Sequence, residues 1–101
     1  MALTLSTTRD DDPVVISVAG DVDLSTAAEL EGALATAVGD AASGVVVDLA
    51  GVTFIDSAGI NALLKGKRLA DERGQRFSVA NPAGVVRDVL ELTGVLGHLS
   101  G

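Results

Sequence analysis

The sequence contains no cysteine, tryptophan or tyrosine, and only two of its 101 residues are phenylalanine. The absence of cysteine excludes disulfides, thiolate zinc sites and cysteine nucleophiles. The scarcity of aromatic rings removes the platform on which single-stranded nucleic acids stack. Because 48% of the chain is nevertheless hydrophobic, the interior must be packed from the methyl groups of Val, Leu, Ile and Ala.

Basic residues are also few, since seven lysines and arginines stand against 14 acidic residues and give a formal net charge of −7. A negative field repels nucleic-acid phosphates, so we expect no direct contact with nucleic acid. The same field favours encounter with a basic surface on another protein. The charge therefore points to a protein partner.

Long apolar runs are missing as well, and none reaches the roughly 18 residues of a membrane helix. The N-terminus lacks the basic and apolar segments of a secretory signal. We therefore expect a cytoplasmic protein without membrane insertion. The length fits one compact domain, so residues 1–101 are predicted to form a single domain.

Apolar stretches typical of strands alternate with amphipathic stretches typical of helices. The strand-like stretches are 3–8, 14–19, 45–49, 52–55 and 76–80. The run at 45–49 is almost continuously apolar, which predicts a central strand covered on both faces. The alternation predicts an α/β domain with a mixed sheet of four to five strands and three helices.

The helix boundaries are predicted from caps and breakers. The first helix should begin near Ser25 and Thr26, since Thr26 can form a capping box with Glu29, and it should end at Gly39. The second should span 57–72. The third should follow Asn81, which is expected to act as its N-cap.

The second predicted helix separates into two faces at about 100° per residue. The face suited to pack on a sheet holds Gly59, Ala62, Leu63, Gly66, Leu69 and Ala70. The opposite face holds Ser57, Ile60, Asn61, Leu64 and Arg68. Because Ile60 and Leu64 share a face with Ser57, we expect a docking patch there, although scattered exposed aliphatics are also common without a function.

Ser57 stands where the second helix should open, and serine is a good N-cap. Capping by itself predicts no regulation. A phosphate on Ser57 would lie at the positive end of the helix near free amides, so it need not unfold the helix. It would add about −1.5 to −2 charge units beside Ile60 and Leu64 and would oppose apolar docking.

Two motifs give the chain a family resemblance. Residues 18–27 read VAGDVDLSTA, and VVVDL at 45–49 leads to FIDSAGI at 54–60. In this order they resemble the motifs of anti-sigma factor antagonists of the STAS domain family. The resemblance extends from the second strand to Gly94 and implies a STAS-like fold.

The resemblance implies partner switching. The unphosphorylated protein would bind an anti-sigma factor that is also a serine kinase, and so release a sigma factor for transcription. Ser57 matches the phosphoacceptor position, and a PP2C-type phosphatase would restore its hydroxyl. ATP belongs to the kinase, so this chain needs no cofactor. The expected partner-binding residues are Asp21, Asp23, Asp56, Ser57, Ile60, Asn61 and Leu64. For Asp23, simple turn or helix-cap chemistry is a nearly equal alternative.

The C-terminus departs from longer members of the family, which continue after the segment matching 95–99 with a complete strand and a further helix. The final helix is therefore expected to be absent. If that helix ordinarily covers part of the sheet, this chain should be less stable or should cover the surface by self-association.

A serine hydrolase is a competing interpretation, because Ser57 follows a strand and begins a helix. The glycine two residues before the serine of a nucleophile elbow is missing, and the only histidine is His98 near the terminus. We therefore do not expect an enzyme. A STAS module of another bacterial assembly, such as a stress-signalling or lipid-transport complex, remains open.

A calcium loop is a further alternative, because Asp21, Asp23 and Ser25 have the early spacing of an EF-hand. Thr26 and Gly32 occupy the positions that need a glycine and a bidentate glutamate. No metal site is expected.

Overall fold

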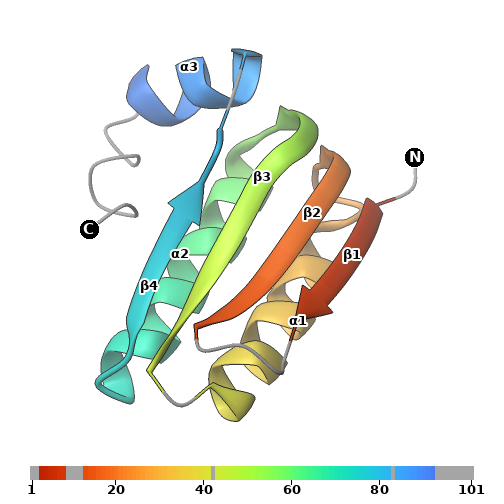
Figure 1. Ribbon diagram of the computed structural model, residues 1–101. Helices are drawn as coiled ribbons and strands as arrows, with labels where there is room; N and C mark the ends of the chain where they lie inside the picture. The colour runs from red at the N-terminus through yellow and green to blue at the C-terminus, as the bar shows by residue number, and fades with distance from the viewer. Residues whose placement is uncertain (1–2, 9–12, 42, 83, 93–101) are drawn as a thin grey trace.

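The computed structural model describes residues 3–8, 13–41, 43–82 and 84–92, and this part of the chain folds into four strands and three helices (Figure 1). The elements in chain order are β1 (Leu3–Thr8), β2 (Val14–Val22), α1 (Ala27–Asp40), β3 (Gly44–Ile55), α2 (Ser57–Glu72), β4 (Arg76–Ala80) and α3 (Gly84–Leu92). The strand order is β1-β2-β3-β4, with β1 antiparallel to β2 and the other pairs parallel. The predicted α/β class with a mixed sheet is confirmed.

Helices α1 and α2 lie side by side on one face of the sheet, and α3 lies beyond the end of β4 (Figure 1). Most of the hydrophobic core lies between these two helices and the sheet, and Val86 and Leu90 of α3 also belong to it. Its fully buried side chains include Ile16, Val18, Leu30, Leu34, Leu49, Ile55 and Leu63. They are aliphatic, as the composition requires. Among the described residues, no helix is long and apolar enough to cross a membrane.

Strand β3 is an interior strand, as predicted, because it pairs with both β2 and β4. The expectation that it is covered on both faces is wrong. Val45 and Val47 are buried on the helix side, whereas Val46 and Asp48 on the other face are only half-buried and Ala50 is exposed.

Strands β2 and β3 are longer than predicted, and β3 joins the two stretches 45–49 and 52–55 into one strand. Two register shifts along β2, between Ser17 and Ala19 and between Gly20 and Asp21, each place one extra residue on β3. Such bulges bend a strand and redirect its side chains. The side chain of Phe54 is exposed as a result, between the buried Val52 and Ile55.

Helix α1 buries the predicted stripe Ala27, Leu30, Leu34 and Val38. The predicted capping box is wrong. Thr26 is buried at the N-cap position, and its hydroxyl donates to the carbonyl oxygen of Asp21 (2.8 Å) and accepts from the backbone N–H of Asp23 (3.0 Å). The hydroxyl thus binds the preceding loop and makes no cap hydrogen bond to α1. Gly39 does not stop the helix, which continues to Asp40.

Helix α3 begins at Gly84, so the prediction that Asn81 caps it is wrong. Asn81 has a φ of 56°, in the left-handed region that asparagine tolerates, and its side-chain amide donates to the carboxylate of Asp48 (3.3 Å). It therefore connects the end of β4 to β3. The C-terminal segment 95–99, where the chain is expected to depart from longer family members, lies outside the described residues.

Candidate functional site

The two sequence motifs meet at one edge of the sheet. Parallel strands β2 and β3 end there together, with Asp21 opposite Phe54 and Val22 opposite Ile55. The backbone N–H of Asp56 donates to the carbonyl oxygen of Val22 (3.2 Å), so the start of α2 is tied to the end of β2. We call residues 21–26 and 53–57 the serine edge.

Asp56, and not Ser57, is the N-cap of α2. Its backbone is extended, and its Oδ1 accepts from the backbone N–H groups of Ala58 (2.9 Å) and Gly59 (3.2 Å). Ser57 is the first helical residue, and its side chain is exposed. Because the cap is already supplied by Asp56, capping does not account for a serine at position 57.

Close packing fixes where α2 begins. A Cβ added to Gly59 would lie 2.6 Å from Val22 Cγ1, 2.7 Å from Ile55 Cγ1 and 3.0 Å from the carbonyl oxygen of Val22. Glycine is therefore required for the helix to approach the strands so closely. The approach holds Ser57 at the serine edge.

The predicted docking face of α2 is only partly exposed. Ser57, Asn61 and Arg68 are exposed, and Leu64 is half-buried against the core. The expectation that Ile60 is exposed is wrong, because only 9% of its surface is exposed and it belongs to the core.

The core face of α2 is also rotated relative to the prediction. Gly59, Ala62, Leu63, Gly66 and Ala70 are buried as expected, but Leu69 is 39% exposed. Helix α2 packs against α1 as well as the sheet, with Gly66 lying against Leu34 and Phe77. These neighbours decide that the buried arc includes Ile60 and excludes Leu69.

Asp23 orders the loop between β2 and α1. Its Oδ1 accepts from the backbone N–H of Ser25 (2.9 Å), from the hydroxyl of Ser25 (2.6 Å) and from the hydroxyl of Thr26 (3.4 Å). The pKa of Asp23 is lowered, first by the hydroxyl of Ser25 and further by the backbone bonds to Ser25 and Thr26, against an opposing effect of desolvation. These bonds show that Asp23 holds the turn, and its expected role in partner binding stays a prediction.

This arrangement predicts the titration of Asp23. We expect its pKa, measured by NMR of the side-chain carboxyl, to lie below the ordinary 3.8 and to rise toward it in Ser25→Ala. Since the folded pKa is the lower one, the stabilising effect of the charge is present above pH 3.8 and is lost as the pH falls through the folded pKa. An unchanged pKa in Ser25→Ala would contradict the assignment.

Two exposed apolar side chains at the serine edge were not predicted. Leu24 is 83% exposed and Phe54 is 43% exposed. Leu24 could have been suspected, because it lies between Asp23 and Ser25 in a loop too short to fold it inward. The exposure of Phe54 could not have been predicted, because the direction of its side chain depends on the bulges in β3. Asp21 completes the edge, and its Oδ1 accepts from the hydroxyl of Thr53 (2.9 Å).

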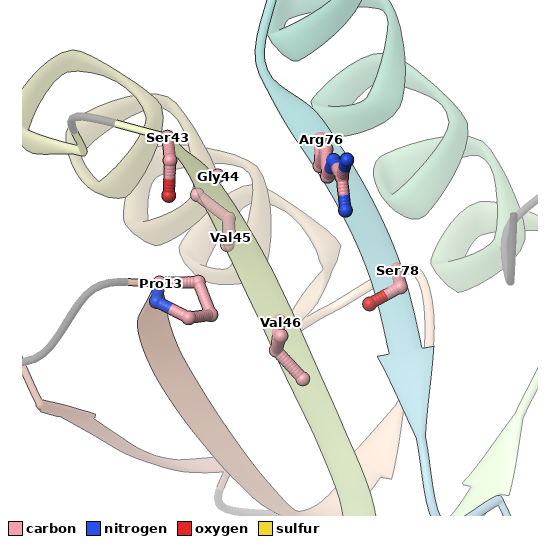
Figure 2. A pocket seen from close by; sticks show the side chains of 7 residues that line it. All are labelled: Pro13, Ser43, Gly44, Val45, Val46, Arg76 and Ser78. Atoms are coloured by element: carbon pink, nitrogen blue, oxygen red, sulfur yellow. The ribbon is translucent and has the colours of Figure 1, made fainter.

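Two other features lie apart from this chemistry. Among the described residues, no group of three or more His, Asp or Glu side chains could hold a metal ion. A pocket of about 440 Å³ lies at the amino ends of β3 and β4. The residues that line it are shown in Figure 2: Pro13, Ser43, Gly44, Val45, Val46, Arg76 and Ser78. None of the predicted site residues lines it.

Comparison with known proteins defines the class. The family model described as "Mlab, STAS domain" matches residues 5–100, so the chain belongs to the STAS domain family. A solved anti-sigma factor antagonist from Mycobacterium paratuberculosis is 32% identical with a TM-score of 0.78, and the match covers 97% of this chain and 83% of that one. No curated protein matches the chain by sequence.

More distant structures share the fold. The Bacillus cell fate determinant SpoIIAA in its phosphorylated form is 24% identical with a TM-score of 0.70, over 99% of this chain and 89% of that one. A sulfate transporter family protein from Wolinella succinogenes is 19% identical with a TM-score of 0.71, over 85% and 70%. At these identities the likeness establishes the fold alone.

Proposed function

We propose that the chain is an anti-sigma factor antagonist that binds an anti-sigma factor with serine kinase activity while Ser57 is unphosphorylated. The observation that carries the proposal is the exposed hydroxyl of Ser57 on a helix already capped by Asp56, at the edge where both motifs meet. The similarity to a solved anti-sigma factor antagonist at 32% identity supports it.

Charge explains how phosphorylation would end the binding. The amides of Ala58 and Gly59, which the sequence suggested were free, are occupied by the carboxylate of Asp56. Segments 14–26 and 44–64, which include the serine edge, contain no lysine or arginine. A phosphate on Ser57 would therefore remain an uncompensated charge at the binding surface, and desolvating it would oppose docking.

In the transfer of phosphate from ATP, this chain would supply only the accepting hydroxyl group. The hydroxyl of Ser57 would be presented in line with the γ-phosphate of ATP, and the kinase would supply the nucleotide, its metal ion and the residue that accepts the hydroxyl proton. The O–P bond to the serine forms as the bond to ADP breaks. Hydrolysis by a PP2C-type phosphatase would restore the hydroxyl.

Phosphorylation by a cognate kinase tests this function. The purified chain would be incubated with ATP and, in turn, with each anti-sigma factor that carries a serine kinase domain and is encoded in the same genome. We expect one phosphate on the wild type and on Ser43→Ala, which changes an exposed serine at the opposite edge of the sheet, and none on Ser57→Ala. Mass spectrometry measures the product. Phosphate on Ser57→Ala, or no phosphate with any kinase, would contradict the proposal.

A STAS module of another bacterial assembly is the second candidate, for example in stress signalling or lipid transport. The description of the matching family model names Mlab and not an anti-sigma factor antagonist, and a sulfate transporter family protein has the same fold. In such a module, binding would not depend on the charge at position 57. Pull-downs in which Ser57→Ala and Ser57→Asp retain the same proteins with equal affinity would favour it.

A further inference from the structure

Leu24 is the most exposed large apolar side chain in the part of the chain that the structure describes, at 83%, and Phe54 follows at 43%. Both lie at the serine edge. Phe54 is opposite Asp21 in the strand register, and Leu24 follows β2 directly after Asp23. Their position on the serine edge distinguishes them from Leu69, which lies in the last turns of α2.

Hydrogen bonds on both sides hold Leu24 outward. The carbonyl oxygen of Asp23 accepts from the backbone N–H groups of Thr26 (3.1 Å) and Ala27 (2.8 Å), and its carboxylate accepts from Ser25. Because this turn is fixed at its two ends, Leu24 cannot fold back to the core without breaking it. A single exposed leucine is ordinary, but two exposed apolar side chains on the edge that carries Ser57 are a candidate contact for a partner.

The surrounding charge indicates the kind of partner. Asp21, Asp23 and Asp56 belong to the same serine edge and are half-buried, and segments 14–26 and 44–64 hold no basic residue. An apolar surface bordered by carboxylates fits an apolar pocket bordered by lysine or arginine.

We propose that Leu24, together with Phe54 of the same edge, is the apolar contact of the anti-sigma factor, in place of the buried Ile60. The partner presents an apolar pocket flanked by basic residues that face Asp21 and Asp23. This inference rests on the proposed function and assigns the contacts that bring the kinase to Ser57.

The test uses the anti-sigma factor kinase that phosphorylates Ser57 in the experiment above. Leu24→Ser is expected to weaken its binding at least about 10-fold in calorimetry, as removal of a central interface side chain does. Leu24→Met keeps an apolar side chain and should retain the affinity. Leu69→Ser, a matched change at another exposed leucine, should also bind like the wild type. Raising the salt concentration should weaken the wild-type complex.

Phosphorylation kinetics separate docking from chemistry. Leu24→Ser should raise the KM of the kinase for this chain and leave kcat unchanged, because an apolar side chain contributes to docking and not to the transfer of the phosphate. Wild-type affinity in Leu24→Ser, with Ser57 still phosphorylated, would overturn the inference and leave the proposed function intact. An affinity that does not change with the salt concentration would overturn the proposal that basic residues of the partner flank the apolar pocket. Failure of every kinase to bind the wild type would reject both.

Discussion

Replacing Ser57 with aspartate is expected to weaken binding to the anti-sigma factor at least about 100-fold, or about 2.7 kcal/mol. The hydroxyl must approach the γ-phosphate of ATP for transfer, so a carboxylate at this position faces the phosphates of the bound nucleotide. Like charges held together across an interface cost several kcal/mol. No lysine or arginine in segments 14–26 and 44–64 offsets the added charge.

Ser57→Asn is the matched control for this effect. Asparagine has nearly the shape of aspartate but no charge, so we expect it to retain most of the affinity. Calorimetry with ADP and without nucleotide measures the difference, and the loss in Ser57→Asp should be larger when ADP is present. Equal affinities of the Asp and Asn variants would show that charge at this position does not control association.

Replacing Gly59 with alanine is expected to lower the free energy of unfolding by about 1–3 kcal/mol, the usual cost of overpacking. The new methyl would lie 2.6 Å from Val22 Cγ1 and 3.0 Å from the Val22 carbonyl oxygen. The side chains of Val22 and Ile55 are fully buried and have little room to move, and the carbonyl belongs to the backbone. The start of α2 must therefore shift away from the sheet, and Ser57 with it.

Gly32→Ala provides the control for the Gly59 prediction, because Gly32 lies in α1 with nothing within 4 Å of an added Cβ. Alanine should stabilise this exposed helical position by up to about 1 kcal/mol. Urea unfolding of both variants measures the two changes, which are expected to have opposite signs. A Gly59→Ala protein as stable as the wild type would mean that the close approach of α2 is not required.

Local patterns were sufficient to predict most of the fold. The helix span 57–72 and the strands 3–8 and 76–80 agree with the structure, because strong caps, glycines and apolar periods mark their ends. The length of β3 was not predictable in the same way. Gly51 interrupts the apolar pattern, and only pairing with β2 shows that the strand continues past it through two bulges.

The sequence placed the residue that a motif locates at a helix start. It misplaced the residues whose exposure or hydrogen bonding depends on tertiary contacts. Ser57 is exposed at the expected helix start. Ile60 was misplaced, since helical angles give the direction of a side chain but not the width of the surface that α1 and the sheet cover together. Thr26 was predicted to cap α1, whereas its hydroxyl forms hydrogen bonds with the backbone of the preceding residues Asp21 and Asp23.

The hydrogen bond from Asp56 to Val22, together with the absence of a side chain at Gly59, holds the start of α2 close against the sheet. We therefore expect a group attached to Ser57 to leave the backbone conformation of this region unchanged. Free and modified molecules should keep the same backbone and differ only in what they show to the outside. Phosphorylation would change only the charge of the surface at Ser57, and the partner alone would respond to that change.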